Sequence, residues 1–209
     1  MKHLRRRLLL AGALLPWLLG TVHAGTDDPH RALLEQLRAG GLVIYWRHAI
    51  TDRSRRDQDL SDMARCERQR NLSEAGREQA RTMGEDIHTL GIPVGEVISS
   101  PFCRNVETAR LGFGRHSLDE GLYNWPPASA ERKPQLVAAL QEMLATPPID
   151  SASNTVLVGH NLNLQQAARV HIEEGDLAVF QPLGAEGFRH LGNLTDGDLR
   201  RLRLDERGR

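Results

Sequence analysis

The sequence contains little cysteine, few aromatic residues and no excess of either charge. Two of its 209 residues are cysteine, 4% are Phe, Trp or Tyr, and 27 Lys and Arg balance 27 Asp and Glu. Because general nucleic-acid binders neutralise phosphates with a basic surplus, this composition argues against that class of protein. Nearly all the basic residues are arginine, which agrees with anion recognition and equally with a bias in genome composition.

The first 24 residues have the pattern of a secretory signal peptide. A basic stretch with Lys2 and three arginines precedes an apolar run over 8–19, and Val22-His23-Ala24 resembles a cleavage site. The run is shorter than the ~20 residues of a membrane span and contains Pro16, so we expect cleavage near Ala24 rather than a retained helix. Either general or twin-arginine export fits this segment. We therefore expect a periplasmic or secreted protein without a stable membrane span.

Cleavage there leaves residues 25–209, which suffice for one domain with its own core. The removed segment holds four of the 27 basic residues and no acidic residue, so the mature chain has a formal charge of −4. In an exported protein the pair Cys66 and Cys103 predicts a disulfide. Two reduced, buried thiols are the alternative. A nucleophilic cysteine is a third reading, although neither residue lies in a recognisable Cys-His setting.

Helical and strand patterns alternate along the mature chain. Short apolar runs at 41–46, 96–99 and 155–158 predict strands buried on both faces, and the pattern favours a further strand at 177–181. This order predicts an α/β domain with a mostly parallel sheet. Helices are expected over 28–39, 73–90, from Pro101 onward, 135–144 and 161–171, and Thr195-Asp196-Gly197 predicts a hairpin between 188–194 and 199–204.

Arginine and histidine follow three of these strands directly. Arg47 and His48 end the first, Arg104 lies in the first helical turn after the second, and His160 ends the third. Ligands of open α/β sheets bind beyond the carboxyl ends of the strands. Two guanidinium groups and a helix N-terminus suit a phosphoryl group, with one histidine as nucleophile and the other neutralising charge. A two-histidine metal site is the rival reading, but no Cys, Asp or Glu cluster has ligand spacing beside either histidine.

Four segments resemble signatures of the histidine phosphatase superfamily, which has the phosphoglycerate mutase-like fold. Arg-His-Ala-Ile-Thr at 47–51 resembles its Arg-His-Gly-x-Thr motif, and residues 72–80 are similar to its Leu-Ser-x-x-Gly-x-x-Gln-Ala helix start. Residues 99–109 are similar to its Ser-x-x-x-Arg-x-x-x-Thr-Ala element, and 159–161 occupy the place of its second histidine motif. The resemblance covers about residues 30–194 and implies a three-layer α/β sandwich.

The resemblance also implies roles for individual residues. His48 would carry the phosphoryl group on its imidazole, and Arg47, Arg104 and His160 would bind that group. Thr51 would add a hydroxyl to the phosphate shell, with turn capping as the plain alternative. No metal and no cofactor is expected, because the arginines and His160 supply the positive charge.

Two positions depart from the family pattern. Ala49 replaces the usual glycine, which matters if that position needs a positive φ or a close backbone approach. The acid that protonates the leaving group is not explicit, since Asn161 follows His160 where one branch has Asp. Residues 118–123 resemble the Leu-x-Glu segment of the other branch, so we expect Glu120 in this role, with Asp119 and Glu107 as the alternatives.

We therefore expect an exported phosphatase that acts on a phosphomonoester or pyrophosphate through a phosphohistidine. The substrate is expected to be a phosphorylated small molecule or a cell-envelope sugar phosphate. The alternative is a catalytically degenerate protein that binds a phosphorylated envelope component, with Ala49 as its symptom. Release of phosphate from an aryl phosphate separates the two hypotheses. The sequence does not indicate the oligomeric state.

Overall fold

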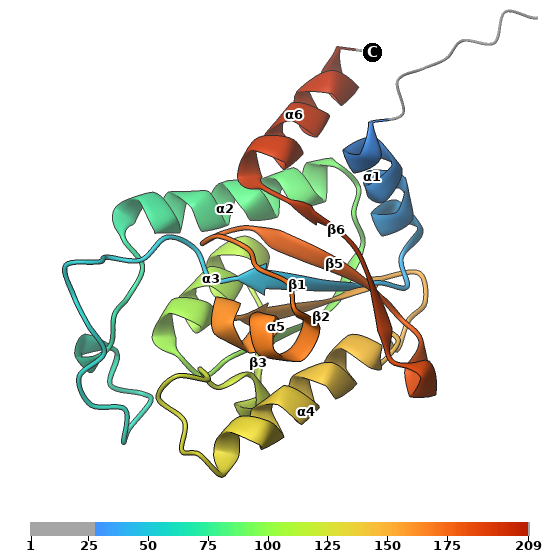
Figure 1. Ribbon diagram of the computed structural model, residues 1–209. Coiled ribbons are helices and arrows are strands. Elements are labelled where there is room, and N and C mark those ends of the chain that lie inside the picture. The colour runs from blue at the N-terminus through green and yellow to red at the C-terminus, as the bar shows by residue number, and fades with distance from the viewer. Residues whose placement is uncertain (1–27, 209) are drawn as a thin grey trace, which may run out of the picture.

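The computed structural model describes residues 28–208, so the expected signal peptide and its cleavage site lie outside the described residues. The described chain forms one six-stranded sheet with helices on both faces (Figure 1). The elements in chain order are α1 (Pro29–Ala39), β1 (Val43–Arg47), α2 (Glu74–Thr89), β2 (Val94–Ser99), α3 (Cys103–Phe113), β3 (Ser117–Leu118), α4 (Arg132–Ala145), β4 (Asn154–Gly159), α5 (Asn161–Ala168), β5 (Leu177–Pro182), β6 (Phe188–Leu194) and α6 (Asp196–Arg207).

The sheet has the strand order β3-β2-β4-β1-β5-β6. The pairs β3-β2, β2-β4 and β4-β1 are parallel, whereas β5 runs antiparallel to both β1 and β6. The expected α/β fold with a mostly parallel sheet is therefore confirmed. Because β1 and β4 are parallel neighbours, with Arg47 opposite Gly159, the residues that follow these two strands emerge side by side.

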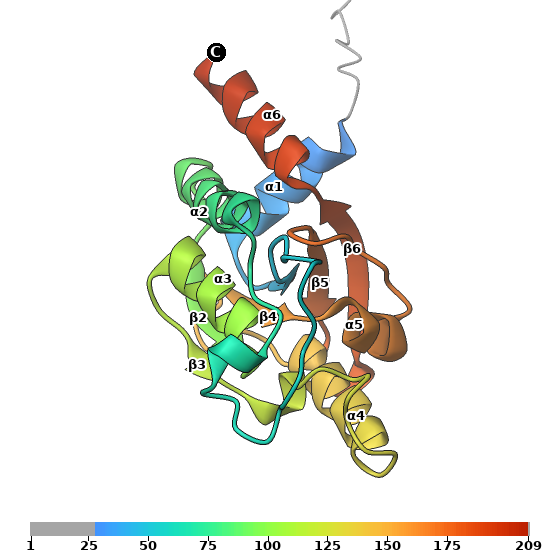
Figure 2. The ribbon, with the colours of Figure 1, turned by 90° about the vertical axis from the view of Figure 1, so that its left-hand side faces the viewer.

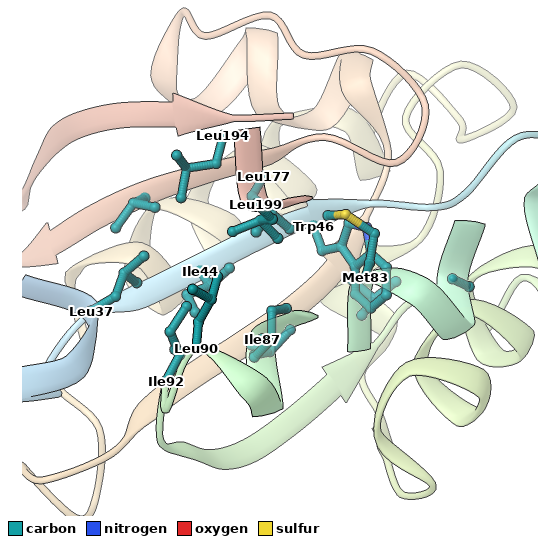
Figure 3. Close-up of a cluster of buried hydrophobic side chains, with 14 of the residues drawn as sticks. Leu37, Ile44, Trp46, Met83, Ile87, Leu90, Ile92, Leu177, Leu194 and Leu199 are labelled. Carbon is teal, nitrogen blue, oxygen red and sulfur yellow. The ribbon is translucent and has the colours of Figure 1, made fainter. Parts of the chain in front are cut away.

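One face of the sheet is covered by α1, α2, α3 and α6 (Figure 2). Their apolar side chains meet the strand residues that alternate onto this face, such as Ile44 and Trp46 of β1 (Figure 3). Ser73 caps α2 as the sequence predicts, by accepting a hydrogen bond from the backbone N–H of Gly76. Met83 and Ile87, spaced by one helical turn, then point from α2 into the core (Figure 3).

The other face of the sheet is covered by α4 and α5. Val43 and Tyr45 of β1 point to this face and pack with Leu140 and Leu144 of α4 and Leu164 of α5. Because β1 buries side chains on both faces, it lies in the central layer of a three-layer sandwich.

Two local predictions are wrong. Residues 196–207 form α6 rather than the second strand of a hairpin, because Thr195 and Asp198 form a capping box and Leu199 and Leu202 are buried on one helical face. The helix after β2 begins at Cys103 rather than at Pro101, with Phe102 as its N-cap. Arg104 nevertheless lies in its first turn, as expected.

Within residues 28–208, no helix combines the length and apolar character needed to cross a membrane.

Candidate active site

The four predicted arginine and histidine residues line one cavity. This cavity, of about 180 Å³, lies beyond the carboxyl ends of β1 and β4. Figures 1 and 2 show the long segment between β1 and α2 extending from this end of the sheet. The lining residues are Arg47, His48, Arg70, Arg104, Asn124, Pro126, His160, Asn161 and Leu162.

The strand ends are tied together by backbone hydrogen bonds. The N–H of His48 donates to the carbonyl of Gly159 (3.1 Å), and the N–H of Ser100 donates to the carbonyl of Val158 (3.0 Å). The side-chain amide of Asn105 also donates to Gly159 (2.9 Å). These contacts fix the starts of α3 and α5 against β1, so the separation of the functional side chains is set by the sheet.

His48 is held as a neutral imidazole with a defined tautomer. Its Nδ1 lies 3.0 Å from the carbonyl oxygen of Ala49, which can only accept, so Nδ1 carries the proton and the lone pair is left on Nε2. Burial, followed by the charges of Arg104 and Arg47, lowers the pKa of His48 well below 6.5. A neutral imidazole with a free Nε2 lone pair is the form that acts as a nucleophile.

His160 lies beside His48, with ring centroids 5.5 Å apart. Its Nε2 is 2.9 Å from the hydroxyl of Ser100, and the ring of Phe102 packs edge-on against it at 5.0 Å. Burial, followed by the charge of Arg104, lowers the pKa of His160 well below 6.5. When the Ser100 hydroxyl donates to Nε2, the opposite nitrogen carries the proton and serves as a hydrogen-bond donor.

Arg104 is 1% exposed, and among the described residues only its Nη1 makes side-chain hydrogen bonds. Its Nη1 donates to Asp57 at 3.0 Å and to the carbonyl of Arg70 at 3.2 Å, and its guanidinium lies 4.5 Å from the ring centre of Phe102. Its Nε is buried and has no hydrogen-bond partner among the described residues. Burial lowers the pKa of Arg104, and the charge of Asp57 opposes this effect.

Arg47 is arranged in a similar way. Its Nη1 donates to the carbonyl of Ile172 at 2.8 Å, and its guanidinium lies 3.5 Å from Glu173 and 3.8 Å from Glu174. Its Nε is also buried without a hydrogen-bond partner in the described chain. Arg47 and Arg104 therefore each keep a buried Nε–H without a partner among the described residues, and buried donors are rarely left unpaired in folded proteins.

Thr51 is buried but is not among the residues that line the cavity. Its hydroxyl donates to Glu174 at 2.8 Å, and Glu174 in turn faces Arg47. The structure thus places Thr51 behind Arg47 rather than in the shell of a bound anion.

The structure does not bring Glu120 to the cavity. Its carboxylate is 68% exposed and pairs with Arg132, because Glu120 lies in a short 3-10 turn that faces the start of α4. Asp119 accepts a hydrogen bond from the N–H of Gly121 and lines a different cavity. Glu107 pairs with Arg77 at 2.9 Å between α3 and α2. None of the three candidate acids lines the cavity of the histidines.

The predicted disulfide between Cys66 and Cys103 is present. It joins the 48–73 segment to the first residue of α3, next to Arg104. Asp57 and Arg70 of this segment contact Arg104, and the sequence pattern does not predict either residue as part of the site. Charge alone does not distinguish them from the other charged residues of the same segment.

Ala49 fits its position without strain. Arg169 is the only residue other than glycine with a positive φ among the described residues, so Ala49 does not need the left-handed conformation. Ala49 is fully buried, and its N–H donates to the hydroxyl of Thr108 at 3.1 Å. The expected need for a positive φ at Ala49 therefore does not arise.

Among residues 28–208, no group of three or more His, Cys, Asp or Glu is placed to hold a metal ion.

Comparisons with known proteins give a family match for part of the chain and a shared fold. Residues 43–126, which include His48 and Arg104, match the model of the histidine phosphatase superfamily, branch 1. No curated protein sequence matches the chain. The fold is similar to that of the protein histidine phosphatase SixA complexed with tungstate, with 13% identity, a TM-score of 0.53 and coverage of 76% of this chain and 99% of that one.

Two further structures share the fold. A putative alpha-ribazole-5'-P phosphatase from Escherichia coli is 15% identical with a TM-score of 0.51, over 68% of this chain and 90% of that chain. A mutant phosphoserine phosphatase from Entamoeba histolytica, in complex with phosphoserine, is 13% identical with a TM-score of 0.50, over 76% and 98%. The match to the histidine phosphatase superfamily is thus carried by residues 43–126, and the similarity to the solved structures is one of fold.

Proposed function

We propose that the protein is a phosphatase that hydrolyses a phosphomonoester or pyrophosphate through a phosphohistidine on His48. One observation carries this proposal. A neutral imidazole with its lone pair on Nε2 shares a cavity with two arginines whose buried Nε–H groups lack partners. A phosphoryl group offers the electrophilic phosphorus and the anionic oxygens that these groups match.

In the first step, Nε2 of His48 attacks phosphorus. The bond from phosphorus to the leaving oxygen breaks, and its electron pair stays on that oxygen. Arg47 and Arg104 bind the other phosphoryl oxygens and hold the charge that spreads over them in the transition state. Nδ1 keeps its proton and its hydrogen bond to Ala49, which orients the ring and stabilises the cationic phosphoimidazole.

In the second step, water attacks phosphorus on the side opposite His48. The phosphorus–nitrogen bond breaks, its electron pair returns to Nε2, the attacking water loses one proton to the solvent, and phosphate leaves. His160 donates a hydrogen bond to the phosphoryl group from the nitrogen opposite Ser100. In this scheme the protein supplies the positive charge itself, so we expect activity to survive dialysis against a chelator. Loss of activity that Mg²⁺ or Zn²⁺ restores would contradict this metal-independent scheme.

We also propose that the protein acts outside the cytoplasm, on a phosphorylated small molecule or a cell-envelope sugar. The signal-like residues 1–24 and the Cys66–Cys103 disulfide support export. The E. coli and E. histolytica proteins of similar fold are named for small phosphorylated molecules, which supports the first substrate class. The mass of the protein recovered from an expressing bacterium tests export, because cleavage near Ala24 removes about 24 residues.

Turnover of p-nitrophenyl phosphate tests the activity. We expect the wild type to release phosphate and His48→Ala to lose this activity while keeping its unfolding temperature within a few degrees, because the change leaves no buried charge unpaired. His88→Ala, at an exposed position on α2, is the matched control and should behave like the wild type. Phosphate binding without turnover or phosphoprotein on any phosphoester tested would support the degenerate binding protein instead.

A further inference from the structure

Arg70 is the third arginine of the cavity, and its guanidinium has no partner among residues 28–208. Arg47 and Arg104 each contact a carbonyl and a carboxylate, whereas no described residue accepts a hydrogen bond or forms an ion pair with the Arg70 side chain. This side chain is only partly exposed. A guanidinium in a cavity without a counter-charge is a binding group for an anion.

The backbone of Arg70 is fixed although its side chain is not. Its N–H donates to Asp57 at 2.9 Å, and its carbonyl accepts from Arg104 at 3.2 Å. The preceding residue, Gln69, is buried and accepts a hydrogen bond from the N–H of Cys103 at 2.9 Å, next to the disulfide. These contacts fix the backbone of Arg70 at the cavity wall, from which its side chain lines the cavity.

The lining of the cavity is cationic. Three arginines and two histidines line it together with Asn124, Pro126, Asn161 and Leu162, and no carboxylate is among these residues. Arg70 is one of the charges that lower the pKa of both cavity histidines and of both other arginines. Asp57 offsets the charge of Arg104, and Glu173 and Glu174 offset that of Arg47. The positive charge of Arg70 therefore remains available to bind an anionic substrate.

The same lining restricts the leaving group. An alcohol leaves slowly unless an acid protonates its oxygen, and a positioned acid contributes about 10²–10⁴-fold to such a step. None of the described residues that line this cavity carries a carboxyl group, and the side chains of Glu120, Asp119 and Glu107 have partners elsewhere. A phosphate leaving group needs no such proton, because the second pKa of a phosphomonoester is about 6.

We propose that Arg70 binds a second phosphate group next to the scissile one, and that the preferred substrate is therefore a phosphoanhydride, such as a diphosphate. This inference rests on the proposed phosphatase function. His48 attacks the terminal phosphorus, the bond from that phosphorus to the bridging oxygen breaks, and the electron pair stays on the departing phosphate. Arg70 holds the charge of that phosphate in place of a proton donor. Water then cleaves the phosphohistidine, which releases inorganic phosphate and one proton.

Three probes and two variants test this inference. The probes are inorganic pyrophosphate, p-nitrophenyl phosphate with its good leaving group, and glycerol 1-phosphate with its alcohol leaving group. We expect wild-type kcat/KM to be highest for pyrophosphate and lowest for glycerol 1-phosphate. Arg70→Gln should lower kcat/KM for pyrophosphate by about 10- to 100-fold, the range expected for one lost charge-assisted contact, and should lower kcat/KM for p-nitrophenyl phosphate by a clearly smaller factor. Arg56→Gln, at an exposed position of the same segment, should change neither value.

The outcomes separate the inference from the function on which it rests. Hydrolysis of p-nitrophenyl phosphate without hydrolysis of pyrophosphate would overturn the inference and leave the phosphatase intact. An equal loss on both substrates in Arg70→Gln, or an equal loss on pyrophosphate in Arg56→Gln, would also overturn it. Hydrolysis of none of the three probes, without a phosphoprotein, would overturn the proposed phosphatase function itself.

Discussion

The phenol oxygen of Tyr45 makes two hydrogen bonds with the backbone of His160. It accepts from the N–H at 2.8 Å and donates to the carbonyl at 2.9 Å, and Tyr45 is fully buried. The ring also lies against Gly159, where an added Cβ would come within 2.0 Å of the phenol oxygen. The strand that carries His48 therefore sets the position of His160 through one side chain.

Tyr45→Phe should weaken this link. It removes the acceptor of the buried His160 N–H, and an unsatisfied buried donor costs about 1–3 kcal/mol. We expect a lower free energy of unfolding and lower turnover of p-nitrophenyl phosphate, measured by urea denaturation and phosphate release. Tyr123→Phe is the control for stability, because the hydroxyl of Tyr123 makes no hydrogen bond within residues 28–208. Equal stability of the two variants would show that the Tyr45 hydroxyl has no such role.

The disulfide should contribute to both stability and substrate binding. Cys66 and Cys103 are 37 residues apart, for which the chain-entropy account gives about 4 kcal/mol. The bond also anchors the segment that carries Asp57 and Arg70 next to Arg104. In the double variant Cys66→Ser, Cys103→Ser we expect a lower melting temperature and, below that temperature, a higher KM with a smaller change in kcat. An unchanged KM would mean that other contacts suffice to hold this segment.

Stability should fall as the pH decreases below about 6.5. Burial lowers the pKa of His48 and His160 in the folded protein, whereas histidines of the unfolded chain titrate near 6.5. Below that pH the unfolded chain binds more protons, so each histidine removes up to about 1.4 kcal/mol of stability per pH unit until its folded pKa is reached. Above pH 6.5 this loss is absent.

Urea unfolding of the wild type and two variants between pH 7.5 and 5.5 measures this dependence. His48→Asn should flatten it, because one depressed titration is removed, whereas exposed His88→Asn should leave it unchanged. The stabilisation by inorganic phosphate should increase toward acid pH, since a bound anion favours the protonated imidazoles. The same slope in the wild type and in His48→Asn would contradict the assigned burial effect.

The central strands and the start of α2 can be predicted from the sequence because residues close together in the chain determine them. The apolar run before Arg47 and the run before His160 identify two neighbouring strands, and their polar ends then share one edge of the sheet. The capping residue Ser73 likewise defines the start of α2. At Thr195 two short-range signals compete, and the capping box with Asp198 outweighs the Asp-Gly turn signal because α6 also buries Leu199.

The remaining features of the site depend on tertiary contacts. The direction of the Glu120 side chain is set by Arg132, which comes from a different element. Arg70 is one of several arginines between β1 and α2, and its backbone contacts with Asp57 and Arg104 help to bring it to the cavity. Neither contact has a signature in the local sequence, so the expected acid and the third arginine could not be chosen correctly from the pattern alone.

Identification of the phosphorylated residue tests the central claim most directly. The protein is mixed with p-nitrophenyl phosphate, quenched in alkali within milliseconds to seconds, digested and analysed by mass spectrometry under conditions that preserve phosphoramidates. We predict one acid-labile, alkali-stable phosphate on the imidazole of His48, which is absent from His48→Ala. Rapid release of phosphate with no phosphohistidine at any time point, or with the phosphate on another residue, would contradict the account.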